Sequence, residues 1–168
     1  MENGTIRVIC GPGNGKTASA IGYGIIRAAA KKRVIVVQFL KGVLEENNVE
    51  ILKRLEPEMK VFRFERSRGL FENLAEEQKK EEIVNLKNGF HFARKVLVTG
   101  ECDVLILDEV LGLLDQNVVS ADEFKKLLES GNGETELVIT GRVCPEEIRK
   151  CVDYVSYVEN IKVDNPGK

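Results

Sequence analysis

The chain of 168 residues carries 25 basic and 27 acidic side chains, and its formal net charge is −2. Because both signs are interspersed, the sequence offers no broad basic face of the kind that binds nucleic acid. The apolar runs are too short to cross a bilayer and no signal peptide precedes the first expected strand, so we expect a cytoplasmic protein without membrane contact. The four cysteines show no CxxC spacing and the chain has one histidine, which disfavours a zinc site and a disulfide framework and favours reduced, buried thiols.

Strand-like and helix-like segments alternate along the whole chain, without a linker or repeat that would mark a second domain. Residues 34–37 and 104–107 are continuously apolar, as is typical of parallel strands covered on both faces. This alternation predicts one domain over residues 1–168, with an α/β, three-layer fold and a mainly parallel sheet of about six strands. The expected strands are residues 5–10, 33–39, 60–64, 103–107, 136–140 and 154–158. The expected helices are residues 17–30, 48–55, 72–98, 121–129 and 145–151.

Two of these helices carry start signals. Ser120 followed by Glu123 has the pattern of a capping box, in which each side chain bonds the backbone of the other residue. Pro145 suits a first helical turn, and Glu146 and Glu147 follow it near the positive end of the helix dipole.

A glycine-rich turn joins the first expected strand to the first expected helix. Its residues, with the start of the helix, are Gly11, Pro12, Gly13, Asn14, Gly15, Lys16, Thr17 and Ala18. Glycines let backbone N–H groups point inward around phosphate oxygens, and the helix start adds its dipole. Lys16 offers a charge for the outer phosphates, and Thr17 a hydroxyl that can ligate Mg²⁺. The strict phosphate-loop pattern requires glycine in place of Cys10, which leaves an ordinary βα turn as the alternative. The order of strand, loop and helix favours nucleotide phosphate binding and a P-loop NTPase (RecA-like) fold.

Two acids end the apolar strand expected at residues 103–107. In a phosphate-loop protein, Asp108 and Glu109 would lie where a carboxylate meets Mg²⁺, opposite the Thr17 hydroxyl. The alternative is that the two adjacent carboxylates belong to an ordinary solvated turn at the end of the strand. The glycine loop favours the magnesium site, with the direct ligand undecided between the two acids.

Cations follow two further expected strands. Lys41 comes after the second strand and Arg142 after the fifth, at the same edge of the sheet as Lys16. Converging cations suit a triphosphate. The alternative is that both are ordinary surface residues beyond a strand.

Four motifs in this order resemble the phosphate-loop class of ATP:corrinoid adenosyltransferases. They are the loop ending in Gly15-Lys16-Thr17, VVQFLKG at residues 36–42, LDE at residues 107–109 and VITGR at residues 138–142. The second and fourth motifs are the more specific, because general ATPases do not share them. The similarity runs from about residue 5 to residue 158.

The resemblance implies that the cobalt(I) of a reduced corrinoid attacks the 5′ carbon of ATP and that triphosphate leaves. No protein nucleophile is needed, and the chain contains no obvious one. The residues implied to stabilise the departing charge are Lys16 and Arg142, with Mg²⁺ held by Thr17 and an acid of Asp108/Glu109. The family also implies a flavoprotein as reductant and a homodimer as the assembly.

Similar enzymes place aromatic side chains on a loop after the third strand, where these displace the lower ligand of cobalt. The matching stretch is residues 66–72, and Phe71 is the best match, with Leu70 beside it. An apolar side chain there would disfavour water on cobalt. The alternative is that Phe71 is a hydrophobic staple of the helix expected from Glu72.

Two positions of the loop depart from the family pattern Gly-Asn-Gly-Lys-Gly-Lys-Thr. Pro12 stands for Asn and removes an N–H, while Asn14 stands for Lys and removes a cation. These departures are expected to bear on nucleotide affinity or orientation. Two other functions stay open beside the leading one: a different phosphate-loop ATPase or kinase, with Glu109 as hydrolytic residue, and a non-catalytic protein that binds nucleotide or corrinoid.

Overall fold

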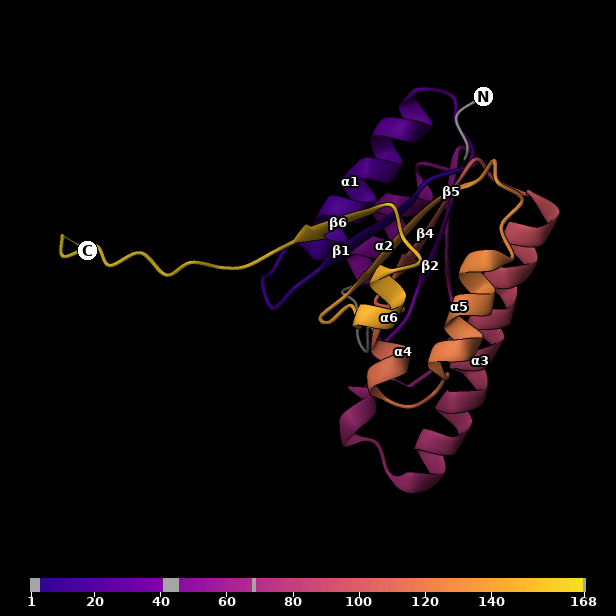
Figure 1. Ribbon diagram of the computed structural model, residues 1–168. Helices are drawn as coiled ribbons and strands as arrows, with labels where there is room; N and C mark the ends of the chain where they lie inside the picture. The colour runs from indigo at the N-terminus through magenta and orange to yellow at the C-terminus, as the bar shows by residue number, and fades with distance from the viewer. Residues whose placement is uncertain (1–3, 41–45, 68, 168) are drawn as a thin grey trace.

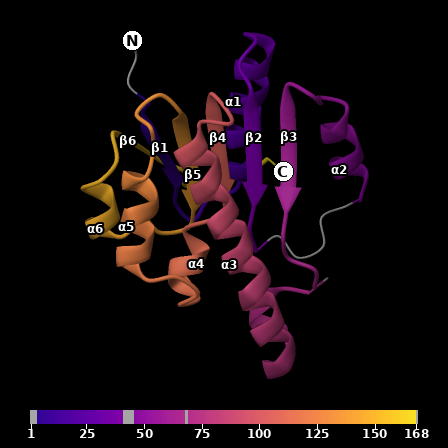
Figure 2. The ribbon, with the colours of Figure 1, turned by 90° about the vertical axis from the view of Figure 1, so that its right-hand side faces the viewer.

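A computed structural model gives the structure of the chain and describes residues 4–40, 46–67 and 69–167. In these residues, six parallel strands form one sheet (Figure 1), in the order β3-β2-β4-β5-β1-β6, which can be followed in Figure 2. The strands are β1 (Ile6–Cys10), β2 (Val34–Gln38), β3 (Met59–Arg63), β4 (Val104–Asp108), β5 (Glu136–Gly141) and β6 (Tyr154–Tyr157). The helices are α1 (Lys16–Ala29), α2 (Glu46–Lys53), α3 (Glu76–Thr99), α4 (Gly112–Asp115), α5 (Ala121–Glu129) and α6 (Glu146–Arg149), with a 3₁₀ turn η1 (Phe71–Asn73).

Helices cover both faces of the sheet. Figure 2 shows α3 and α5 in front of the strands and α1 behind them. Alternate side chains of one strand enter two different cores, because successive residues of a strand point to opposite faces. In β4, Leu105 and Leu107 join the core beneath α3 and α5, whereas Val104 and Ile106 join the core beneath α1. The expected α/β, three-layer fold with a parallel sheet is therefore confirmed, and it is consistent with a P-loop NTPase-like fold.

Four of the five expected helices start at a different residue than predicted, α3 by the most, and one helix was not expected. The long helix α3 begins at Glu76 rather than Glu72, after Leu74 has left the helical conformation, and Gln78 accepts a hydrogen bond from the backbone N–H of Ala75. The capping box of α5 is confirmed by reciprocal bonds between Ser120 and Glu123. Pro145 is the N-cap of α6 and not part of its first turn. The unexpected helix is α4.

The state of the cysteines and the character of the helices can be stated for the described residues. All four cysteines are free, three of them are buried, and burial raises the pKa of the Cys102 thiol to about 12. Across the part of the chain that the structure describes, none of the helices combines the length and apolar character that crossing a bilayer requires.

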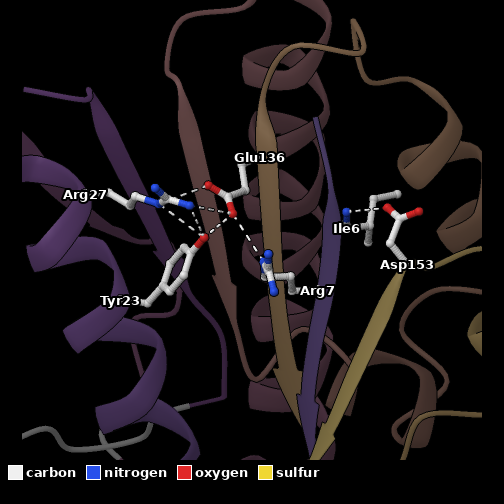
Figure 3. Close-up of polar contacts among 6 residues, drawn as sticks. All are labelled: Ile6, Arg7, Tyr23, Arg27, Glu136 and Asp153. Carbon is white, nitrogen blue, oxygen red and sulfur yellow. Dashed lines mark hydrogen bonds and ion pairs between the residues drawn. The ribbon is translucent and has the colours of Figure 1, made fainter. Parts of the chain in front are cut away.

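A polar cluster near the start of β5 joins α1 to the sheet (Figure 3). Glu136 accepts a hydrogen bond from the Tyr23 hydroxyl, and its carboxylate lies 3.3 Å from the Nε atoms of both Arg7 and Arg27. Only 15% of the Glu136 side chain is exposed, against 37% for each arginine. Burial, and then the bond to Glu136, raises the pKa of Tyr23, so this phenol stays a donor.

We expect Glu136→Gln to lower the free energy of unfolding by about 1–2 kcal/mol, because a half-buried set of charge-assisted hydrogen bonds loses its anion. Urea denaturation followed by circular dichroism measures this loss. Glu134→Gln, at an exposed position two residues earlier, is the matched control and should leave the midpoint unchanged. Equal midpoints for the two variants would mean that the cluster contributes nothing to stability.

Candidate active site

The glycine loop, residues 11–17, takes backbone conformations that explain its composition. Gly11 has φ = 124° and Gly15 has φ = 99°, and residues with a Cβ rarely adopt such values. Cys10, which replaces the glycine of the strict pattern, is the last residue of β1 and pairs in register with Gly141. The position that breaks the pattern therefore has strand geometry and needs no glycine.

A pocket of about 590 Å³ opens beside this loop. Its walls come from the loop and the start of α1, from α2, and from the residue after β4. The lining residues are Asn14, Gly15, Lys16, Thr17, Ala18, Ile21, Ile51, Leu52 and Glu109. The pocket thus joins backbone N–H groups, one cation and one acid to an apolar wall, which is the composition of a site for a charged ligand with an apolar part.

Lys16 turns back over the loop. Its Nζ atom donates a hydrogen bond of 2.6 Å to the carbonyl oxygen of Gly13, and the side chain is half-buried. A carbonyl oxygen is a weak partner for an ammonium group compared with phosphate oxygens. The structure therefore holds the charge at the mouth of the loop, within the pocket lining.

Asp108 is fully buried and is the centre of a hydrogen-bond network at the end of β4. Its Oδ1 atom accepts from the hydroxyls of Thr17 at 3.0 Å and Thr140 at 2.8 Å. Its Oδ2 atom accepts from Nε2 of Gln38 at 3.1 Å. The expected neighbourhood of Asp108 and Thr17 is thus present, although β5 lies between β4 and the loop strand β1.

Glu109 behaves differently from Asp108. It has φ = 62°, an uncommon value for a residue with a side chain, and its backbone N–H donates to the Thr140 hydroxyl at 2.8 Å. The side chain is half-buried and lines the pocket. The backbone turn therefore separates the two acids, with Asp108 beneath the Thr17 hydroxyl and Glu109 in the pocket wall.

The first part of the loop is bound to neighbouring chain segments instead of lining the pocket. The Gly11 N–H donates to the carbonyl of Arg142 at 2.9 Å, and the Gly13 N–H donates to that of Val158, also at 2.9 Å. Pro12 is exposed. Arg142 directly follows β5 at this edge, but its side chain is exposed and is not part of the pocket lining.

Phe71 and Leu70 are not among the residues that line the pocket. Phe71 is in η1, where it is half-buried and packs against the core beneath α3, while Leu70 is 58% exposed. Since α3 begins at Glu76, Phe71 is not the staple of a helix starting at Glu72. Lys41 lies outside the described residues.

Sequence reasoning missed four residues that shape this region. Gln38 and Thr140 bond Asp108, and Arg63 donates from Nε and Nη2 to Oε1 of Gln38 at 3.0 and 3.1 Å. Glu82, a buried residue of α3, accepts from the backbone N–H of Arg66 at 3.1 Å and so fixes the loop after β3. Gln38 and Thr140 could have been recognised as site residues because they lie inside the two specific motifs. Glu82 could have been recognised because it is an acid on the buried face of a helix.

A bound metal would need ligands beyond acidic side chains. Over residues 4–40, 46–67 and 69–167, no group of three or more His, Cys, Asp or Glu residues could hold a metal ion. The available donors are the Thr17 hydroxyl and the carboxylates of Asp108 and Glu109. Mg²⁺ is commonly bound by one or two such protein groups together with substrate phosphates and water, so this donor set fits it.

Comparison with known proteins gives one family. The description "ATP:corrinoid adenosyltransferase BtuR/CobO/CobP" matches residues 2–165. The corrinoid adenosyltransferase of Escherichia coli K12 is 26% identical over 161 residues, which cover 96% of this chain and 79% of that protein. The corrinoid adenosyltransferase CobA of Salmonella typhimurium LT2 has the same identity and coverage. An uncharacterized protein of Nostoc sp. PCC 7120, all2391, is 29% identical, over 89% of this chain and 42% of its own length.

Proposed function

The chain belongs to the ATP:corrinoid adenosyltransferase family, and from this premise we propose that it transfers the 5′-deoxyadenosyl group of ATP to the cobalt(I) of a reduced corrinoid. In this step a cobalt–carbon bond forms at the 5′ carbon, the bond from that carbon to oxygen breaks, and triphosphate leaves. The observation that carries the proposal is the pocket in which the N-terminal residues of α1, Lys16 and Glu109 meet. The family implies ATP and a corrinoid as substrates.

The proposed task of the loop is to hold the triphosphate and to stabilise the charge that grows on the departing oxygen. The N–H groups at the start of α1 and the Lys16 ammonium supply positive potential at the same place. Arg142, which follows β5 at this edge, is proposed to add a second cation when ATP is bound. A fixed polyphosphate orients the ribose carbon toward the attacking cobalt, which reduces the entropy lost on reaching the transition state.

We assign Mg²⁺ to the Thr17 hydroxyl and an acid of the pair Asp108/Glu109. The ion would neutralise charge on the leaving triphosphate. Asp108 accepts a hydrogen bond from the Thr17 hydroxyl. The Thr17 oxygen therefore has only its lone pairs to offer to other groups, as a cation ligand must. Glu109 lines the pocket and can reach a metal directly or through water.

The corrinoid is proposed to bind against the loop after β3. Phe71 would lie against the lower face of the ring, and Glu82 would keep the start of this loop in place through Arg66. A flavoprotein as electron donor, a homodimer and a cytoplasmic location are part of the same proposal.

One reaction tests this function. Purified protein is mixed with ATP, Mg²⁺ and chemically reduced cobalamin without oxygen, and products are followed by the cobalt–carbon absorption spectrum and by chromatography. Adenosylcobalamin and free triphosphate in equal amounts are the expected result. ADP or phosphate formed without corrinoid would instead identify an ATPase or kinase, and binding without product would identify a non-catalytic protein.

We expect Phe71→Ala to slow transfer to cobalamin about tenfold or more and to affect transfer to cobinamide much less, because cobinamide lacks the lower base that Phe71 is proposed to displace. Parallel kcat/KM measurements with the two corrinoids give this ratio. Leu74→Ala, a half-buried neighbour beyond η1, is the control for a packing defect. If Phe71→Ala slows both corrinoids equally, its role is structural.

A further inference from the structure

We propose that Arg63, acting through Gln38, is a positioning residue for Asp108, one of the two acids proposed to hold Mg²⁺. This inference rests on the proposed function in taking Mg²⁺-bound ATP as the ligand of the pocket and Asp108 as an acid that helps to hold the ion. The three residues end the neighbouring strands β3, β2 and β4, and they lie in register across the sheet, with Gln38 paired to Arg63 on one side and to Asp108 on the other.

The hydrogen bonds among Arg63, Gln38 and Asp108 fix the orientation of the Gln38 amide. Arg63 donates from two nitrogen atoms, Nε and Nη2, to the single oxygen Oε1 of Gln38. The nitrogen of the same amide donates to Oδ2 of Asp108 at 3.1 Å. A rotated amide would place its NH₂ against the guanidinium and its oxygen against the carboxylate, which are both repulsive contacts. Arg63 therefore fixes which end of Gln38 faces Asp108.

Burial makes this orientation important. Gln38 is 3% exposed and Asp108 is 0% exposed, so water cannot replace a lost bond to either side chain. The amide holds Oδ2 of Asp108, and this leaves Oδ1 aimed at the hydroxyls of Thr17 and Thr140. The guanidinium also supplies a positive charge near the buried carboxylate, with one amide between them.

Arg63 itself is only half-buried and lies outside the pocket lining. It therefore acts on the ligand through Asp108 and not by touching it. Outer hydrogen-bond partners of metal ligands typically change metal affinity about 10–100-fold when they are removed. We therefore expect Arg63 to affect Mg²⁺ affinity only when Gln38 is present.

The test is a calorimetric titration of Mg²⁺ into protein with a fixed concentration of ATP, without corrinoid. We expect Arg63→Met to raise the Mg²⁺ concentration at half-saturation about tenfold, while ATP affinity without metal stays within about twofold. Arg63→Lys keeps the charge but not the two parallel N–H bonds, and should give a smaller increase of about threefold. Lys60→Met, an exposed position on the same strand, is the matched control and should leave the titration unchanged.

The dependence on Gln38 separates positioning from a general packing defect. In a Gln38→Met background, Arg63→Met should have no further effect on half-saturation, since the connection to Asp108 is already broken. The proposal is overturned if Arg63→Met changes half-saturation less than twofold, or if its effect is undiminished in that background. If Arg63→Met loses its cooperative melting transition, Arg63→Lys takes its place, alone and in the Gln38→Met background. The proposal is then overturned if Arg63→Lys changes half-saturation less than twofold, or if its effect is undiminished in that background.

This outcome and that of the proposed function can be told apart. A wild-type protein that binds Mg²⁺ and ATP with the expected Arg63 dependence but forms no adenosylcobalamin would overturn the proposed function alone. A protein that forms adenosylcobalamin without any Arg63 dependence of Mg²⁺ binding would overturn this inference alone.

Discussion

Lys16→Ala should reduce kcat/KM for adenosyl transfer by about 10²–10³-fold or more, because it removes the ammonium proposed to stabilise the departing triphosphate. The side chain lies at the mouth of the loop, 2.6 Å from the Gly13 carbonyl, and it lines the pocket. Loss of a preorganised cation acts mainly on the transition state, in which the leaving oxygen gains charge. We therefore expect kcat to fall more than ATP affinity.

The experiment for Lys16 uses steady-state transfer with reduced cobalamin and, separately, equilibrium binding of ATP. Lys126→Ala, at an exposed position of α5, is the matched control for loss of one lysine and should retain full activity. Lys16→Arg keeps the charge but brings a larger, planar group into the loop, so it should recover only part of the rate. Unchanged turnover in Lys16→Ala would place the reacting ATP somewhere other than this pocket.

The parts of the fold that follow from local pattern could be predicted from the sequence. The continuously apolar runs at β2 and β4 indicate strands covered on both faces, and these strands do lie inside the sheet. The succession of strand, glycine loop and helix could also be predicted, because a short continuous stretch of sequence contains all of its signals. The small helix α4 was missed because its four residues begin with a glycine and are too few for a helical period.

The contacts inside the site could not be predicted in the same way. Gln38, Arg63, Thr140 and Asp108 come from four strands, and which of their residues meet depends on the register between strands. A single sequence does not contain that register. The bond from the Gly13 N–H to the Val158 carbonyl joins residues from opposite ends of the chain, and no local pattern of the loop indicates it.

The difference between the two acids after β4 also required the structure. From the sequence, Asp108 and Glu109 are equivalent candidates for the metal. In the structure, Asp108 is fully buried beneath Thr17, whereas the positive φ of Glu109 brings its side chain to the pocket wall. A backbone turn of this kind depends on packing from both sides and is not encoded in a local propensity.

Asp108→Asn is expected to weaken Mg²⁺-dependent transfer about 10–100-fold while leaving the protein folded. The amide oxygen of the new side chain would stay on Gln38, which can only donate there because Arg63 holds its other end. The amide NH₂ would then face Thr17 and act as a donor to its hydroxyl. The Thr17 oxygen would thus direct a lone pair at the introduced amide instead of presenting it to a cation.

The stability of Asp108→Asn distinguishes this loss from unfolding. Replacing a buried carboxylate by a neutral amide removes a desolvation cost. The bond from Gln38 is kept, and the hydroxyls of Thr17 and Thr140 can turn to accept from the introduced NH₂ group, so the free energy of unfolding should change by no more than about 1 kcal/mol. Thermal unfolding without ligand measures this, and a Mg²⁺ titration of the transfer rate measures the functional loss. Asp164→Asn, in the exposed C-terminal segment, is the matched control. A wild-type Mg²⁺ dependence in Asp108→Asn would assign the metal to Glu109 and Thr17 without help from Asp108, since the half-buried Glu109 carboxylate is the other acid at this end of β4.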